Sequence, residues 1–144
     1  MRSFAAEMIW PANVSSASAG LVDVASAHSV DETVERLQAA LQAKGVPLFT
    51  VIDHSGEAAK VGLTMPATKL LVFGNPRAGT PIMLAAPRSA IDLPLKLLVW
   101  QDGDQKVWIT YNSLDYLGER HHLAAEMLRG LAVVETLASQ AAGR

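Results

Sequence analysis

The sequence contains no cysteine among its 144 residues. Without thiols the chain has no disulfide, no thiol nucleophile and no thiolate metal ligand, and its compartment cannot be read from oxidation chemistry. Long apolar runs are also missing, since no stretch approaches the roughly 18 apolar residues that a membrane-spanning helix needs. We therefore expect no membrane association, and a reducing cytoplasm is the expected location.

Charge is scarce as well: Asp, Glu, Lys and Arg make up 18% of the residues, and the formal net charge is −2. No run of Lys and Arg forms a basic stripe for phosphate backbones, so we expect no nucleic-acid partner. The sequence also lacks a Gly-x-Ser-x-Gly nucleophile turn, a dinucleotide fingerprint and any nucleophile placed beside a base. These absences favour a protein that is not an enzyme.

The chain is rich in hydrophobic residues, which form 50% of the sequence. A chain of this length and composition folds as one domain with a sizeable core. We expect that domain over residues 21–144, preceded by an N-terminal extension over residues 1–20. In the extension, Ala17-Ser18-Ala19 resembles the residues before a signal cleavage site, but Glu7 and Pro11 interrupt the apolar run that export requires. Export of the protein through this segment is the alternative to a cytoplasmic location.

The hydrophobic pattern predicts five strands and two principal helices. Ser29 and Glu32 form a capping box at the start of the first helix, which Lys44-Gly45 ends. Asp102-Gly103 predicts a hairpin between the last two strands. The third strand is so uniformly apolar that we expect it at the centre of the sheet. The expected strands are 21–27, 47–53, 69–74, 95–101 and 106–112, and the final helix is expected to run from 123 to 142.

This order, β-α-β-β-β-β-α with short extra helices, predicts an α+β fold. We expect two layers, with an antiparallel sheet of about five strands and helices on one face. The two strands after residue 94 carry bulky apolar groups on both faces, so one face would remain exposed. At about 25 cal/mol per Å2, covering several hundred Å2 would stabilise an association by on the order of 10 kcal/mol. A homodimer formed through the sheet is the expected solution, with the N-terminal extension as the competing cover.

The loop from Gly74 to Thr80 is the first candidate site. Its glycines have the spacing of a phosphate-binding loop, but Thr80 stands where that motif needs lysine. Thr80-Pro81 reads as an N-cap and first-turn proline, so the free N–H groups of a helix start, with Arg77 close by, could hold a small anion. The alternative is a rigid turn in which Asn75 bonds its own backbone. The candidate ligand-binding residues are Asn75, Arg77, Gly79 and Thr80.

Histidines supply the second candidate site. Asp53 and His54 follow a strand, and His121 ends a short helix, so the three could meet as metal ligands or as an acid–base couple. A divalent metal is the single cofactor that this hypothesis would imply. Capping or solvated histidines are the commoner arrangement. Asp92 is expected to pair with Lys96 or to cap a turn.

Four motifs resemble a known bacterial family, the domain of unknown function 302. They are VIDHSGEAAKVGL, FGNPRAGTP, AIDLPLKLLVW and VWITYN, and the resemblance covers roughly residues 22–123. It implies a small α+β layer structure similar in topology to the TATA-binding-protein fold, and a tendency to form dimers. Many relatives have a cysteine just before the Asn-Pro pair. Gly74 occupies that position here, which argues against thiol chemistry.

The sequence thus leaves two classes of function. The first, which we favour, is a non-enzymatic dimeric module that binds a small anionic molecule or a protein partner through the 75–80 loop. The second is an enzyme or metal-binding protein that uses Asp53, His54 and His121.

Overall fold

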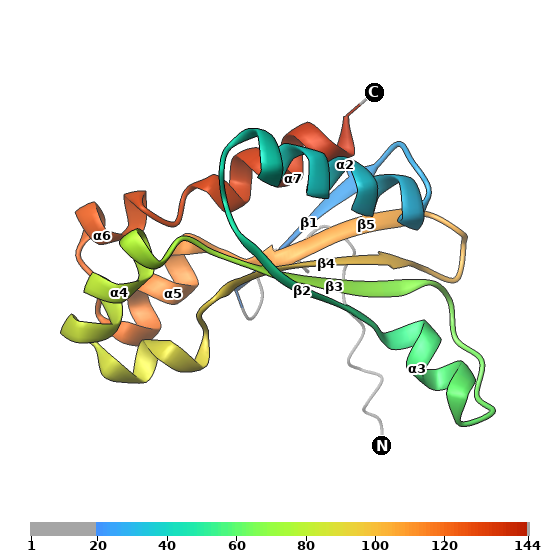
Figure 1. Ribbon diagram of the computed structural model, residues 1–144, viewed down its shortest axis with the longest axis horizontal. Helices are drawn as coiled ribbons and strands as arrows, with labels where there is room; N and C mark the ends of the chain where they lie inside the picture. Colours follow the sequence, from blue (N-terminus) through green and yellow to red (C-terminus); the bar gives the residue numbers. More distant parts are fainter. Residues whose placement is uncertain (1–19, 144) are drawn as a thin grey trace, which may run out of the picture.

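The computed structural model describes residues 20–143, so residues 1–19 of the expected extension, with the signal-like pattern, lie outside the described residues. A five-stranded antiparallel sheet forms the centre of the molecule, in the order β1-β5-β4-β3-β2 (Figure 1). Together with its helices this sheet confirms the predicted α+β fold. The strands are β1 (Leu21–Ser26), β2 (Leu48–Asp53), β3 (Thr68–Phe73), β4 (Leu95–Gln101) and β5 (Val107–Asn112).

Two helices form the second layer of the fold on one face of the sheet. They are α2 (Val30–Ala43) and α7 (Val133–Ala142), which lie side by side above the strands (Figure 1). The capping box is present as predicted: the Ser29 hydroxyl accepts from the Glu32 N–H, and the Glu32 carboxylate accepts from the Ser29 N–H. The core between the layers consists of fully buried aliphatic and aromatic side chains, among them Leu37, Leu71, Phe73, Leu97, Ile109 and Leu137.

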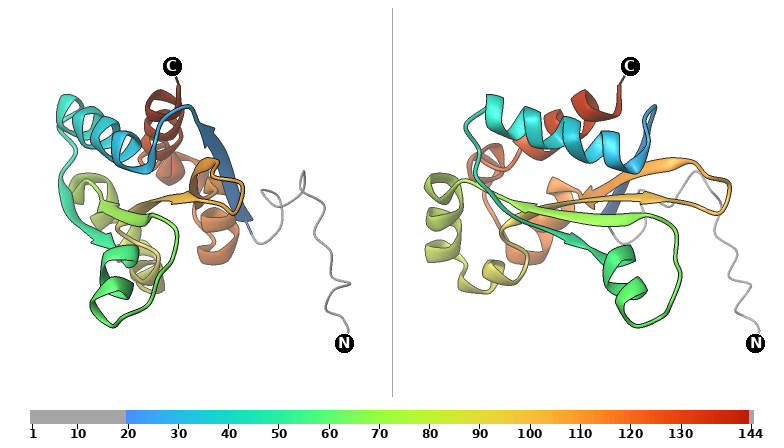
Figure 2. Two further views of the ribbon diagram at one scale, coloured as in Figure 1. Left: turned by 90° about the vertical axis from the view of Figure 1, so that its right-hand side faces the viewer. Right: turned by 45° about the vertical axis from the view of Figure 1, so that its right-hand side comes forward.

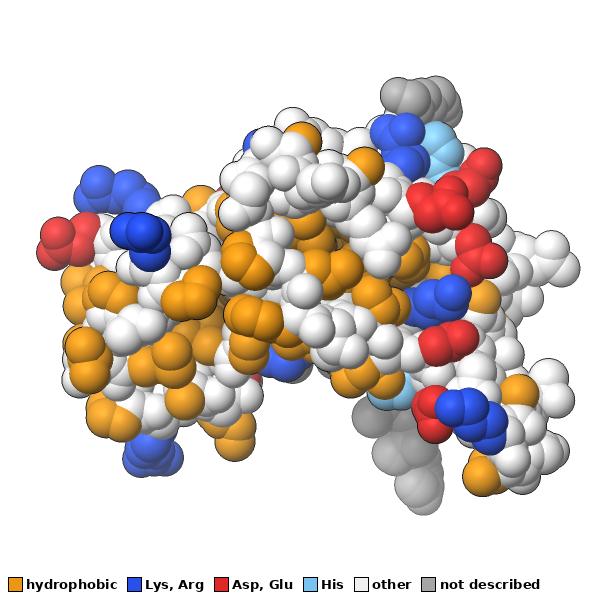
Figure 3. All heavy atoms as spheres, viewed as in Figure 1, with side chains coloured by type: hydrophobic (Ala, Val, Ile, Leu, Met, Phe, Trp, Pro, Cys, Tyr) orange, Lys and Arg blue, Asp and Glu red, His pale blue; other side chains and the backbone are white. Residues whose placement is uncertain are grey.

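The remaining helices lie at the two ends of the sheet. Helix α3 (His54–Lys60) follows β2 at one end, and a helical lobe gathers at the other end (Figure 2). The lobe contains α4 (Pro76–Ala85), the 3₁₀ helix η3 (Pro87–Ile91), α5 (Leu114–His121) and α6 (Ala125–Arg129). In Figure 3 apolar side chains gather on the visible surface of this lobe, whereas charged side chains line the opposite end.

Helix α4 begins five residues earlier than the sequence suggested. Asn75 is its N-cap and Pro76 its first residue, so Thr80 and Pro81 lie inside the helix and the expected helix start at Thr80 is wrong. Both sites offer an N-cap residue followed by proline. The earlier one prevails because the Asn75 carboxamide accepts a hydrogen bond from the Arg77 N–H at 2.9 Å. The interior proline is accommodated within the helix.

The final helix is also interrupted. Instead of one helix over 123–142, the chain forms α6, turns at Gly130 and continues as α7. A Cβ atom added at Gly130 would lie 3.2 Å from the Cβ of Ala78, so glycine allows the backbone to approach α4 closely. The break therefore follows from packing between two segments that are far apart in the sequence.

The centre of the sheet is β4 rather than β3. Strand β3 is an interior strand that pairs with β2 on one side and β4 on the other, which explains its apolar sequence without a central position. The predicted hairpin joins β4 to β5, with Trp100 opposite Trp108.

Candidate functional site

A pocket of about 250 Å3 lies where α4 meets the ends of β2, β3 and β4 and the turn between α6 and α7. We call it the α4 pocket. Its lining combines residues from distant parts of the chain: Val46, Phe49, Gly74, Asn75, Pro76, Ala78, Gly79, Thr80, Met83, Leu93, Pro94, Leu95, Gly130, Leu131 and Val133.

The loop singled out in the sequence forms one wall of this pocket. Asn75, Gly79 and Thr80 contribute to the lining, whereas Arg77 does not. The Arg77 side chain is exposed, and its N–H is bonded by the carboxamide of Asn75. The rigid turn that we considered as the alternative is therefore present. The helix start at Thr80, whose N–H groups were expected to bind an anion, is absent because Thr80 lies inside α4.

Glycines leave room inside the pocket. A Cβ atom at Gly79 would lie 3.9 Å from both the Leu93 Cδ1 and the Met83 Cε atoms, which is an ordinary contact distance. Phe49 stands at an irregularity in the pairing of β2 with β3 and keeps 52% of its surface exposed. Its ring contributes to the pocket lining near Gly74, where an added Cβ atom would lie 3.8 Å from Phe49 Cε2.

The lining is almost wholly apolar. Among residues 20–143, Asn75 and Thr80 are the two polar side chains of the lining, and no lining residue is charged. Since an ion would lose its hydration here without gaining a counter-charge, the pocket favours a neutral apolar group. Its volume lies just below the range of roughly 300–1,000 Å3 that is common for ligand pockets.

The pocket wall coincides with the motif that carries the family resemblance, and a family model matches the chain over residues 22–140. The chain belongs to the family described as Domain of unknown function DUF302. The match extends beyond the region expected from the motifs alone and includes α6 and most of α7, so the whole pocket lies within the DUF302 domain.

Curated relatives of this DUF302 chain are named as ion channels. The chain is 43% identical over 114 residues to "Fluoride-specific ion channel FluC 1" of Brucella suis biovar 1, and the match covers 79% of this chain and 45% of the relative. The same identity and the same share of this chain are found with FluC 1 of Brucella abortus biovar 1, of which 42% is covered. The chain thus spans less than half the length of these relatives. No helix within residues 20–143 is long and apolar enough to cross a membrane.

A solved structure shares the fold. The crystal structure of an uncharacterized conserved DUF302 protein from Bacillus stearothermophilus superimposes with a TM-score of 0.70, at 18% sequence identity, over 85% of this chain and 95% of that one. At this identity the similarity shows a common fold.

The structure does not bring together the residues of the second candidate site. Asp53 lies opposite Lys69 in the register of β2 and β3, at one end of the sheet. His121 contacts Asp92 just before the start of β4, at the end where Leu95 lies opposite Phe73. The strand length from Lys69 to Phe73 alone is about 13 Å. Among the described residues no group of three or more His, Asp or Glu side chains is placed to hold a metal ion.

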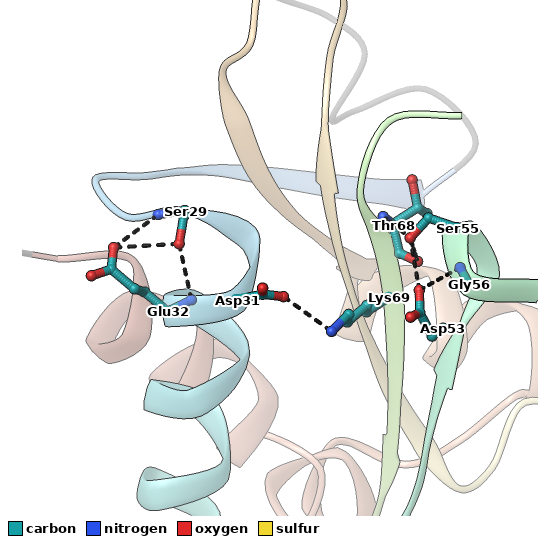
Figure 4. A network of polar contacts seen from close by, with 8 residues as sticks. All are labelled: Ser29, Asp31, Glu32, Asp53, Ser55, Gly56, Thr68 and Lys69. Atoms are coloured by element: carbon teal, nitrogen blue, oxygen red, sulfur yellow. Dashed lines mark hydrogen bonds and ion pairs between the residues drawn. The ribbon is translucent and has the colours of Figure 1, made fainter. Parts of the chain in front are cut away.

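Asp53 has a structural role at its end of the sheet. As the N-cap of α3 its carboxylate accepts from the Ser55 hydroxyl at 2.7 Å and from the Gly56 N–H at 2.9 Å (Figure 4). The Ser55 hydrogen bond, followed by that from Gly56, lowers the pKa of Asp53 below its usual value of 3.8. His54, the first residue of α3, is exposed.

His121 has a different carboxylate as its partner. Its Nε2 atom donates to the Oδ2 atom of Asp92 at 2.6 Å, and both side chains are largely buried, with 7% and 13% of their surfaces exposed. The expectation that Asp92 pairs with Lys96 is thus wrong for its carboxylate. The Lys96 ammonium donates instead to the backbone carbonyls of Asp92 and Pro94, and burial lowers the pKa of Lys96.

No pattern in the sequence indicated the Asp92–His121 pair. The two residues stand 29 positions apart, and the pair forms only because η3 packs against α5. A spacing pattern such as His-x-x-x-His would have been visible in the sequence, whereas a contact between two short helices is not.

Proposed function

We propose that this DUF302 chain is a non-catalytic binding module that holds a small molecule with an apolar body in the α4 pocket. The observation that carries the proposal is the lining itself, which combines a concave apolar surface with two polar side chains. Such a combination is typical of small-molecule sites, in which apolar contacts supply affinity and a few polar groups fix orientation. Asn75 and Thr80 would orient the ligand.

An anionic group on that ligand is the finer part of the proposal. Because none of the described lining residues is a cation, the anionic group would have to extend beyond the pocket to reach Arg77, an exposed residue between the lining residues Pro76 and Ala78. The matched pair heptanol and heptanoate separates the two parts, since both have the same apolar body and one carries a carboxylate. Tighter binding of heptanoate that is lost in Arg77→Gln would support the anionic ligand. Equal binding of both, or preference for heptanol, would contradict it.

The absence of cysteine makes a direct test of the pocket straightforward. In Thr80→Cys the single thiol stands in the pocket wall, and in the control Lys60→Cys it stands on α3, where the native side chain is 71% exposed. We expect saturating heptanol to slow the reaction of a thiol reagent with Thr80→Cys several-fold and to leave Lys60→Cys unchanged. Equal rates in the presence and absence of heptanol at both positions would remove the proposal.

We further propose that the module works as a homodimer formed through the sheet. Strand β2 is an edge strand, and its Leu48, Phe49 and Ile52 side chains are 36%, 52% and 37% exposed. Ile52 continues with Leu70 and Leu98 as an apolar row across β2, β3 and β4. An exposed apolar edge is a common site of strand association, and a second copy is the simplest partner that covers it.

Light scattering at micromolar concentration tests the dimer. We expect the native chain to have twice the monomer mass, and Ile52→Lys to shift the equilibrium toward the monomer. Lys60→Glu, a charge change on the nearby helix α3, is the matched control and should remain dimeric. A monomeric native chain would rule the dimer out.

The Brucella relatives favour a second candidate, a domain that acts together with a membrane fluoride channel. Its basis is that a closely similar segment occupies part of chains named as fluoride channels. The test is fluoride flux through vesicles that contain the other part of a Brucella chain, measured with and without this chain. A change in flux supports the candidate, and unchanged flux at saturating protein contradicts it.

A further inference from the structure

A second cavity lies on the helical lobe, between η3 and the C-terminal end of α5. This η3–α5 cleft has a volume of about 720 Å3 and shares no residue with the α4 pocket. Its lining differs in character, because four of its residues are Arg or His: the full set is Ala86, Pro87, Arg88, Ile91, Arg120, His121 and His122.

The Arg120 guanidinium is held in place by its neighbours. Its Nη1 atom donates to the Tyr116 hydroxyl at 2.7 Å and to the Asp92 carboxylate at 3.3 Å. Its Cζ atom lies 5.8 Å from the centre of the Tyr116 ring. Both of the hydrogen bonds that Arg120 forms within residues 20–143 use Nη1, so its Nε and Nη2 donors remain available for another group. A guanidinium fixed in this way loses little conformational freedom when it binds an oxyanion.

Arg88 has no ion-pair partner among residues 20–143. It is exposed, and the four ion pairs of the described residues, which involve Lys60, Lys69, Arg120 and His121, do not include it. Asp92 is the carboxylate that contacts residues of the cleft, and it is already shared by Arg120 and His121. The cleft therefore has two guanidinium groups and one contacting carboxylate, whereas the whole chain has a net charge of −2.

We propose that the η3–α5 cleft binds the carboxylate or phosphate group of a small molecule, with Arg88 and Arg120 as its two cationic contacts. Arginine suits this role because its planar fork of N–H donors matches the oxygens of either group. Ile91, with 72% of its surface exposed, and Pro87 form an apolar wall beside the two arginines for the remainder of the molecule. The site is separate from the α4 pocket and does not depend on the function proposed for it.

Inorganic phosphate and butyrate are suitable probes, titrated at constant ionic strength and followed by the amide and arginine Nε–H resonances of residues 86–92 and 116–122. Constant ionic strength is needed because salt screens exposed charges. We expect shifts in both segments. A stronger response to phosphate assigns the site to phosphate-bearing molecules, and a stronger response to butyrate assigns it to carboxylates.

Arg88→Gln is the decisive variant, since Arg88 has no partner in the described structure whose loss would disturb the fold. We expect about a tenfold weaker interaction, as for the loss of a charge-assisted hydrogen bond, with a similar loss in Arg120→Gln. Arg129→Gln on α6, an exposed arginine outside the lining, is the matched control and should bind like the native chain. Unchanged binding in Arg88→Gln, or an equal loss in Arg129→Gln, would overturn the proposal. Absence of shifts in both segments with both probes would overturn it as well.

Discussion

The α4 pocket and the η3–α5 cleft belong to the same helical lobe but differ in nearly every chemical property. The pocket is smaller, has no charged lining residue and is bounded by glycines and aliphatic side chains. The cleft is larger, carries two arginines and two histidines, and lies beside the buried Asp92 carboxylate. Helix α4 contributes to the first and η3, which follows it directly, contributes to the second. One residue, Ala86, separates these two helices. Consecutive helices thus line one surface that favours apolar groups and another that favours anions.

Among substitutions that alter one of the two sites, we expect the largest effect to be a loss of stability. Asp92→Ala removes the partner of His121 and Arg120 beneath the cleft, and should lower the free energy of unfolding by about 1–3 kcal/mol, the cost of leaving a buried polar group unpaired. Binding of heptanol in the α4 pocket should persist. Asp31→Ala is the control because Asp31, 76% exposed, forms an ion pair with Lys69 on the surface. Its loss should cost less than about 1 kcal/mol in urea unfolding. Equal losses would contradict a structural role for the buried pair.

Filling the α4 pocket should weaken binding there and leave binding at the η3–α5 cleft unchanged. Gly79→Leu places a branched side chain in the space between Leu93 and Met83, so we expect heptanol affinity to fall by tenfold or more, about 1.4 kcal/mol. Phosphate binding at the cleft should stay within about twofold of the native value. Parallel titrations by NMR check both. A joint loss would show that the two sites are coupled.

A smaller change at the same position should raise stability. Gly79 lies inside α4, and a Cβ atom there makes only ordinary contacts, so Gly79→Ala should increase the free energy of unfolding by about 0.5–1 kcal/mol. Gly130→Ala should gain less, because its Cβ would press against Ala78 at 3.2 Å. Thermal unfolding of both variants is the measurement. A larger gain at Gly130 would show that the approach of α6 to α4 is not tight.

The smallest effect concerns Asp53, at the end of the sheet opposite both sites. Because its pKa in the folded state is lowered from 3.8, its contribution to stability is fully present above about pH 4 and is lost as the pH falls through the lowered value. Asp53→Asn should therefore flatten the decline in stability as the pH falls below about 4, as measured by urea unfolding. An unchanged pH profile would show that Asp53 is protonated at the same pH in the folded and unfolded chain.

Elements that depend on local rules could be predicted from the amino-acid sequence. The capping box at Ser29 and the Asp-Gly hairpin between β4 and β5 were predicted because each is satisfied by residues a few positions apart. The strand pattern was sufficient for the α+β class, and the four motifs together were sufficient for the family. One of them, at residues 74–80, also located one wall of the α4 pocket.

Packing between distant segments settled which residues meet. The break at Gly130 depends on its contact with Ala78, and the Asp92–His121 pair depends on the packing of η3 against α5. The pairing of β2 with β3 and of β3 with β4 places Asp53 at one end of the sheet and the start of β4, near which His121 lies, at the other. Contacts of this kind join residues that no spacing rule connects, because their positions depend on how the elements pack.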